Sequence, residues 1–251
     1  MKKTEIYSYY AFGYNYALLK RDGLSGYPIK QSITILDSFF NNLKILELQV
    51  SQKIAEELLN ILNALGQSDD LIVNEDTAKK IKTEVERIDP ALDAELQLKA
   101  AYVLTKKRYP LESLLNTPGE LLGTGVYGRL SDVAKQDYLL ACTQVALNQP
   151  TAAAFHLMRM LEEQVKVLYF SFKKTNRLQT PMWGPMIREL RSKRAPQPSE
   201  KLLNHLDGMR VHFRNPTQHP EIFYTIDEAQ DLLNQTLTAV NMIFAELPIG
   251  T

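Results

Sequence analysis

The chain has 251 residues, 45% hydrophobic and 23% charged, a composition typical of globular proteins and unlike that of disordered or fibrous chains. Basic and acidic residues number 29 each, so the net charge is zero, which argues against a protein that coats nucleic acid or a membrane surface. The single cysteine, Cys142, excludes an internal disulfide and a cysteine-cluster metal site. The sequence shows no long apolar run and no secretion signal, which predicts a cytoplasmic protein.

Residues 1–128 are expected to form an N-terminal helical region of unknown role. Its first 30 residues are rich in tyrosine and glycine, and their pattern does not decide between strand and helix. Over residues 33–65 apolar side chains recur every three or four positions, which predicts one long amphipathic helix that Gly66 ends. A more charged helix is expected over residues 76–88, and an Asp-Pro pair then begins another over residues 90–108.

Between Tyr109 and Leu130 the apolar periodicity decays and glycines and prolines crowd together, which predicts a domain boundary, placed after residue 128. The second domain, residues 129–251, shows helical periodicity and no alternating strand pattern. Its helices are expected over residues 131–148, 151–172, 199–214 and 226–247, the last opening with a capping box of Thr225 and Glu228. The predicted class is all-α, with a compact antiparallel helical bundle at the C-terminus.

The stretch VHFRNPTQHPEIF, residues 211–223, sets Arg214 and His219 on either side of an Asn-Pro-Thr-Gln sequence. Asparagine before proline disfavours the α conformation, so we expect a helix to end near Arg214 and Asn215 to cap a new turn begun by Pro216. The N–H groups of a helix start favour a phosphate. The pattern therefore predicts an anion-binding corner with one fixed cation and one imidazole that titrates near neutrality. On spacing alone, an ordinary polar helix end is the commoner explanation of the same residues.

Within the helix over residues 151–172, Arg159 and Glu162 lie three positions apart beside the main apolar arc. A half-buried carboxylate at that margin needs a cationic partner, and Arg159 is the nearest one. Alternatively, Arg159 and Glu162 together orient Arg214 or His219 from the neighbouring helix. The sequence leaves both arrangements open.

The segment over residues 173–201 carries eight lysines and arginines against two acidic residues, a local net charge of +6. It is either a solvated basic loop or a rim that binds phosphates, with Trp183 available to stack on a base. The residues expected to bind RNA are Lys173, Lys174, Arg177, Arg188, Arg191, Lys193, Arg194 and, in the following helix, Arg210.

An Arg-x-x-Glu helix, a basic spacer, the motif Arg214-Asn215-x3-His219 and a final helix, taken in this order, resemble the HEPN superfamily of small α-helical domains. The resemblance covers residues 131–247, about half the chain, and Pro216 inside the motif is a departure that stiffens the turn. It implies a homodimer in which two motifs share a cleft. Active members are metal-independent endoribonucleases, often toxins or effectors of antiviral defence and toxin–antitoxin systems, whereas other members are non-catalytic binding or assembly modules.

The resemblance implies that Arg214 and His219 are catalytic, that Asn215 orients the phosphate, and that Glu162 and Arg159 support them. His219 would be the general base or acid and Arg214 would hold the phosphate, without a metal or other cofactor. Expected partners are RNA, a second copy of the chain, and an antitoxin or defence-system protein. Two alternatives stay open: a non-catalytic dimerisation or binding module, and a nucleotide sensor that binds phosphate without cleaving RNA.

Overall fold

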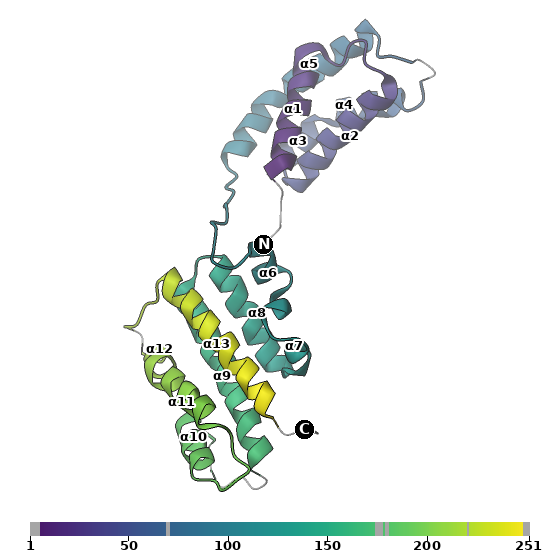
Figure 1. The fold of residues 1–251 in the computed structure, drawn as a ribbon. Coiled ribbons are helices and arrows are strands. Elements are labelled where there is room, and N and C mark those ends of the chain that lie inside the picture. The colour runs from purple at the N-terminus through teal and green to yellow at the C-terminus, as the bar shows by residue number, and fades with distance from the viewer. Residues whose placement is uncertain (1–5, 69–70, 174–177, 179–180, 220, 248–251) are drawn as a thin grey trace. The chain divides into compact units, whose positions relative to one another are not determined.

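The computed structural model describes residues 6–68, 71–173, 178, 181–219 and 221–247. These residues form helices and their connections, and the β pairing found among them is one antiparallel bridge between Pro28 and Ile72. The fold class is all-α, as predicted. The chain divides into two compact units, an N-terminal unit, Met1–Tyr102, and a C-terminal unit, Val103–Thr251 (Figure 1). None of the helices in the described ranges is long and apolar enough to cross a bilayer.

The N-terminal unit packs its helices around one apolar core. Their bounds are α1 Ile6–Asp22, α2 Ile29–Ile45, α3 Gln49–Ile54, α4 Glu56–Leu65 and α5 Glu75–Gln97. The tyrosine-rich start of the chain is thus helical, which its sequence pattern left undecided. Leu19, Phe39 and Ile81 come from three different helices and are completely buried together.

The single long helix expected over residues 33–65 is wrong, because the chain turns twice within that range. α2 ends at Ile45, and Glu47 adopts the left-handed conformation with φ of +55° before α3 begins. Ala55 then separates α3 from α4. The turns bring Leu48 and Leu58 into the same core as α2, so the apolar stripe folds back on itself instead of extending along one rod.

The helix expected over residues 90–108 is also wrong, because Pro90 lies inside α5 and residues 98–108 are not helical. Asp89 therefore does not cap a helix. Its carboxylate accepts hydrogen bonds from Tyr16 and Lys20 of α1, and these bonds hold the pKa of Asp89 below its usual value. The pair of bonds joins α1 to α5, and this contact contributes to the assembly of the N-terminal unit.

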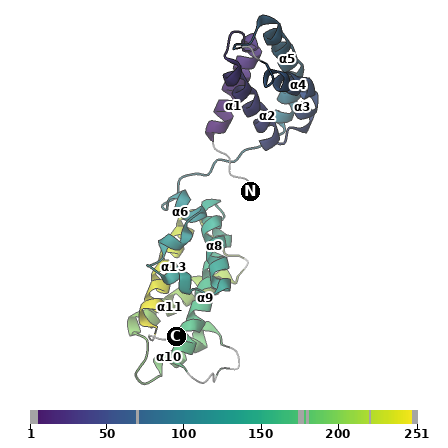
Figure 2. The same ribbon diagram turned by 90° about the vertical axis from the view of Figure 1, so that its right-hand side faces the viewer.

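The C-terminal unit is a helical bundle in which α9 is central and packs against α8, α10 and α13 (Figure 1, Figure 2). The main helices are α8 Asp132–Ala146, α9 Pro150–Phe172, α10 Trp183–Arg191, α11 Glu200–Met209 and α13 Ile226–Glu246. α11 continues into a π-helical turn, η2 Arg210–Arg214, and then into α12 Asn215–Thr217. The predicted capping box is confirmed, since Thr225 and Glu228 exchange side-chain and backbone hydrogen bonds at the start of α13.

The glycine- and proline-rich segment over residues 109–130 belongs to the C-terminal unit, so the division lies after Tyr102 and not after residue 128. The segment forms the short elements α6 Leu111–Leu115, η1 Pro118–Leu121 and α7 Val126–Arg129. Leu114, Leu122 and Leu130 are buried in the core of this unit. The backbone N–H of Gly123 donates to the side chain of Asn241 at 2.8 Å, which fixes one of the turns on α13.

Helix α10 lies inside the segment interpreted as a basic spacer. Its apolar residues Trp183, Met186, Ile187 and Leu190 are buried and recur at the spacing of one helix face, a signal that was present in the sequence. Trp183 is only 1% exposed and belongs to the core, so the expectation that it stacks on a base is wrong.

Cys142 is completely buried in the same core, beside Tyr138, and burial raises the pKa of its thiol to about 12. We predict that iodoacetamide does not label folded protein at pH 8 but labels it after unfolding, because the thiolate is the nucleophile. An unfolded thiol ionises near pH 8.5. The stability contribution of the protonated thiol is therefore complete below about pH 8.5 and is lost as pH rises towards 12. Rapid labelling of the folded chain, followed by mass spectrometry, would contradict the assignment.

Candidate functional site

Arg214 and His219 lie at the C-terminal end of one continuous helical segment. α11 runs directly into η2, where the N–H of Asn215 donates to the carbonyl of Arg210, five residues back. Asn215 has α-helical angles, φ −65° and ψ −50°, and α12 follows without a gap. The predicted helix end at Arg214, with Asn215 as a cap, is therefore wrong.

The π-helical turn explains why the proline does not end the helix. In an α-helix the ring of Pro216 would collide with the carbonyl four residues earlier. The five-residue bonds of η2 widen the turn just before the proline and remove that constraint. As a result, the helical segment ends in carbonyl groups. The carbonyl of Pro216 accepts a hydrogen bond from the N–H of His219 at 2.8 Å. A helix start that offers N–H groups to a phosphate is not formed here, so this helix end does not supply the backbone N–H groups expected of the anion-binding corner.

Glu162 of α9 pairs with Arg214. Its Oε2 lies 3.3 Å from both Nε and Nη2 of Arg214, and its Oε1 lies 3.4 Å from Nη2. The two side chains are 24% and 27% exposed. Of the two arrangements left open for Glu162, the structure shows the pair with Arg214. No described residue bonds Nη1 of that guanidinium, so the group is held in place while donors stay free for a ligand.

Arg159 pairs with Asp137 of α8 and not with Glu162. Its Nε lies 3.3 Å from Asp137 Oδ2, and Nδ1 of His156 lies 2.8 Å from the other oxygen of the same carboxylate. Asp137 is only 3% exposed. Sequence reasoning missed this residue, because its partners are about twenty positions away on another helix and only the packing of α8 on α9 brings them together.

The side chain of His219 is exposed at the end of the segment, and no hydrogen bond to its imidazole is found in the part of the chain that the structure describes. Its backbone is fixed, since the carbonyl of His219 accepts the N–H of Ile222 at 3.3 Å. Asn215, four residues earlier in the chain, is partly exposed. The imidazole is therefore accessible to a ligand from solvent.

The basic residues expected to bind RNA are largely neutralised by neighbouring carboxylates. The pairs are Lys173 with Glu189 at 3.5 Å, Arg191 with Glu200 and with Asp207, and Arg210 with Asp207 at 2.9 Å. Lys193 donates to the carbonyls of Arg194 and Pro196. Lys174 and Arg177 lie outside the described residues. Arg188 and Arg194 are exposed, and among the described members of the set theirs are the only side chains for which the described structure shows no ion pair or hydrogen bond.

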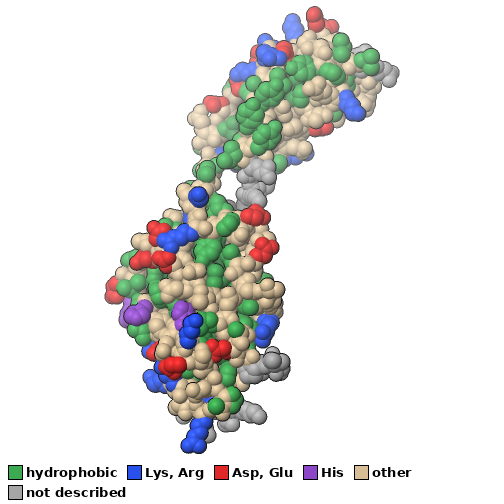
Figure 3. Space-filling model, viewed as in Figure 1, with side chains coloured by type: hydrophobic (Ala, Val, Ile, Leu, Met, Phe, Trp, Pro, Cys, Tyr) green, Lys and Arg blue, Asp and Glu red, His purple; other side chains and the backbone are tan. Residues whose placement is uncertain are grey.

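Figure 3 agrees with this description, since basic and acidic side chains are interspersed on the visible face of the C-terminal unit. The local net charge of +6 was summed over residues 173–201 and therefore omits Asp207. The carboxylate of Asp207 pairs with Arg191 and Arg210. A continuous phosphate-binding rim is therefore not formed by the described residues of this segment.

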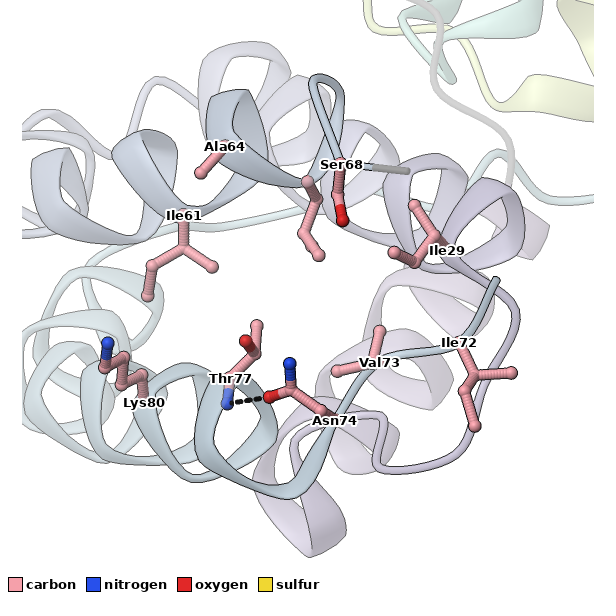
Figure 4. A pocket seen from close by; sticks show the side chains of 10 residues that line it. Ile29, Ile61, Ala64, Ser68, Ile72, Val73, Asn74, Thr77 and Lys80 are labelled. Atoms are coloured by element: carbon pink, nitrogen blue, oxygen red, sulfur yellow. Dashed lines mark hydrogen bonds between the residues drawn. The ribbon is translucent and has the colours of Figure 1, made fainter. Parts of the chain in front are cut away.

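A cavity of about 240 Å³ lies in the N-terminal unit between α4 and the start of α5 (Figure 4). Its walls include Ile61, Leu65 and Val73, and the side chain of Asn74 at its edge caps α5 by accepting the N–H of Thr77. None of the predicted site residues line it. Within the described ranges, no three His, Cys, Asp or Glu side chains lie together in a way that could hold a metal ion.

No protein-family model, characterised protein or solved structure matches this chain. A functional interpretation therefore depends on the chemistry of the side chains at the site. The informative group is the guanidinium of Arg214, oriented by Glu162 and followed five residues later by an accessible imidazole.

The carboxylates of Asp137 in α8 and Glu162 in α9 are predicted to differ in their effect on stability. Asp137→Ala should lower the free energy of unfolding by about 1–3 kcal/mol, because it removes a buried acceptor from His156 and Arg159. Glu162→Gln should cost less than about 1 kcal/mol, because its ion pair is partly exposed. Urea unfolding followed by the fluorescence of the single tryptophan measures both, and equal losses would contradict the assignment.

Proposed function

We propose that the C-terminal unit is a HEPN-type, metal-independent endoribonuclease that acts in the cytoplasm as a toxin or defence effector. The observation that carries the proposal is the guanidinium of Arg214, fixed by Glu162 with Nη1 unbonded by any described residue, in the same short segment as the exposed His219. The π-helical turn that ends at Arg214 supports the proposal as well, since such turns are frequent at functional sites.

In the proposed reaction, the imidazole of His219 accepts the proton of a ribose 2′-OH. The 2′ oxygen then attacks the adjacent phosphorus, and the bond from phosphorus to the 5′ oxygen breaks. Arg214 binds the non-bridging oxygens and stabilises the charge that grows on them. The products are a 2′,3′-cyclic phosphate and a 5′-hydroxyl end, and general acid–base catalysis of this kind contributes about 10² to 10⁴ in rate.

The leaving 5′ oxygen needs a proton, and each chain supplies one His219. A dimer that brings two copies of the motif to one cleft would provide one imidazole as base and the other as acid. The exposure of His219 at the surface of the unit is compatible with such a shared cleft. Glu162 supports the reaction by orienting Arg214. Asn215, the next residue after Arg214, orients the phosphate.

A second candidate function is partner binding through the N-terminal unit. Tyr7, Tyr10 and Tyr14 form a stripe along α1 and are 72%, 66% and 57% exposed. Their rings contact one another, with centroids 5.9 and 6.4 Å apart along the stripe. Exposed aromatic side chains of this kind are enriched at protein interfaces. Under this second candidate function, the C-terminal unit dimerises without cleaving RNA.

We predict that the purified chain cleaves single-stranded RNA in excess EDTA and that His219→Ala lowers the rate at least about 10²-fold. Arg214→Ala should lower it by a similar factor, because the growing phosphate charge loses its partner. Cleavage is measured by gel electrophoresis, and the 2′,3′-cyclic phosphate end is identified by mass spectrometry.

The chain offers matched controls for both substitutions. His212→Ala removes another exposed imidazole from η2, and Arg129→Ala removes an exposed arginine of α7 that lies outside the predicted RNA-binding set. Both should cleave at the wild-type rate. Cleavage that survives His219→Ala and Arg214→Ala would show that the site is not catalytic. Growth inhibition on expression in bacteria, abolished by His219→Ala, separates catalysis from the partner-binding alternative.

A further inference from the structure

We infer that Phe155 and Arg159 of α9 form the surface on which an unpaired RNA base stacks, next to the phosphate that Arg214 holds. The inference rests on the ribonuclease function proposed above, and it names the substrate class as single-stranded RNA. Neither side chain is needed for the proton transfer, so both would act on substrate binding.

The segment that carries His219 runs antiparallel to α9. At one end Arg214 pairs with Glu162, and at the other the N–H of Tyr224 donates to Oγ1 of Thr151 at 3.1 Å. α12, between these two contacts, also packs against α9. The described residues of this segment, 214–219 and 221–224, therefore follow the stretch of α9 that extends from Glu162 back to Thr151.

Phe155 lies on the face of α9 that this segment follows. It is four residues after Thr151 and seven before Glu162, and these spacings place all three on one side of an α-helix. With a rise of 1.5 Å per residue, Phe155 is about 10 Å along α9 from Glu162. A nucleotide adjacent to the bound phosphate would therefore meet the ring of Phe155.

The ring of Phe155 is exposed where its neighbours are not. It is 41% exposed, whereas Ala154, Leu157 and Met158 are at most 2% exposed. The guanidinium carbon of Arg159 lies 5.7 Å from the centre of the ring, and the ring of His156 contacts it edge-on at 5.9 Å. The surface is thus an aromatic ring with a cation over it, and the side chain of Arg159 is itself 52% exposed.

The buried carboxylate of Asp137 fixes this surface from below. It binds Nδ1 of His156 at 2.8 Å and Nε of Arg159 at 3.3 Å, so the two residues beside Phe155 are both held to α8. A surface that is ordered before binding loses less conformational entropy when a ligand arrives. This gives the buried Asp137 a role in positioning the base-binding surface.

The chemistry of the pair fits an unpaired base. Bases that are not in a duplex stack on aromatic rings and on arginine guanidinium planes, whereas the bases of a duplex are already stacked on one another. Stacking of this kind tolerates any base, and the positive charge of Arg159 attracts the backbone. The surface therefore favours single strands without a strong sequence preference.

The test measures binding of a fluorescent single-stranded RNA to the full chain, with His219→Ala present throughout so that the RNA stays intact. Phe155→Ala and Phe155→Leu should each weaken binding about 5- to 100-fold, and Phe155→Trp should retain it. Phe170→Ala is the matched control, since Phe170 lies on the same helix with 46% exposure. It should change binding less than about twofold. Thermal unfolding of every variant shows that it is folded, and Phe155→Leu, which keeps an apolar side chain, remains informative if Phe155→Ala is unstable.

An RNA that lacks one base beside the cleavage position provides the decisive comparison. Removing that base should weaken binding to the Phe155-containing chain by a factor similar to that of Phe155→Ala. It should have no further effect on the Phe155→Ala chain, because the two changes remove the same contact. If the two changes together weaken binding by the product of their separate factors, the inference is overturned.

The outcomes separate this inference from the proposed function. If the chain cleaves RNA in a His219-dependent manner and Phe155→Ala binds and cleaves like the unmodified protein, the stacking surface is refuted and the ribonuclease stands. If the unmodified chain neither binds nor cleaves single-stranded RNA, both are refuted. If Phe155→Ala weakens RNA binding, and the same variant with His219 intact cleaves at the unmodified rate once RNA is saturating, both the stacking surface and the ribonuclease function are supported.

Discussion

The ion pair between Glu162 of α9 and Arg214 of η2 is the contact on which the candidate site depends. It joins the central helix of the bundle to the segment that carries His219, and it orients a guanidinium without bonding all of its donors. A carboxylate that accepts from Nε and Nη2 leaves Nη1 for an anion. The pair is partly exposed, so its contribution to stability is small and its main effect is on the position of the side chain.

The π-helical turn before Pro216 determines which groups meet a ligand. Because the helix continues through the proline, its end presents carbonyl oxygens near His219, and the positive end of a helix dipole is not available for a phosphate. Under the proposed function, the phosphate would be bound by Arg214 and by the exposed Arg159, because most described members of the predicted RNA-binding set are occupied by carboxylates or carbonyls. A site of this composition would bind one or two nucleotides locally, in agreement with a chain whose net charge is zero.

The parts of the fold that follow from local pattern were predictable from the sequence. The helices α8, α9 and α13 have regular apolar spacing, and the capping box of Thr225 and Glu228 marks the start of α13. The errors arose where tertiary contacts prevail over local preference. Glu47 takes a left-handed conformation so that Leu48 reaches the core, and Pro216 continues a helix because the preceding turn widens.

At the site, the sequence indicated Arg214, His219 and Glu162, and the structure pairs two of them directly. The partner of Arg159 could not be predicted, because Asp137 is brought to it by the packing of two helices and not by spacing along either. The same applies to the basic segment, where counting charges along the chain did not include Asp207. Ion pairs between distant residues are set by the fold, so a local charge sum overestimates the free charge.

The most direct test of the account is the signal of the Arg214 Nε–H group in a nitrogen–proton NMR spectrum, assigned by its loss in Arg214→Lys. The titrant is an RNA with one 2′-deoxy nucleotide at the cleavage position, which can bind but lacks the attacking hydroxyl. The account predicts that this signal shifts as the RNA binds and that Arg214→Lys weakens the binding. Saturable RNA binding that leaves the signal of Arg214 unchanged would contradict the claim that this guanidinium holds the phosphate.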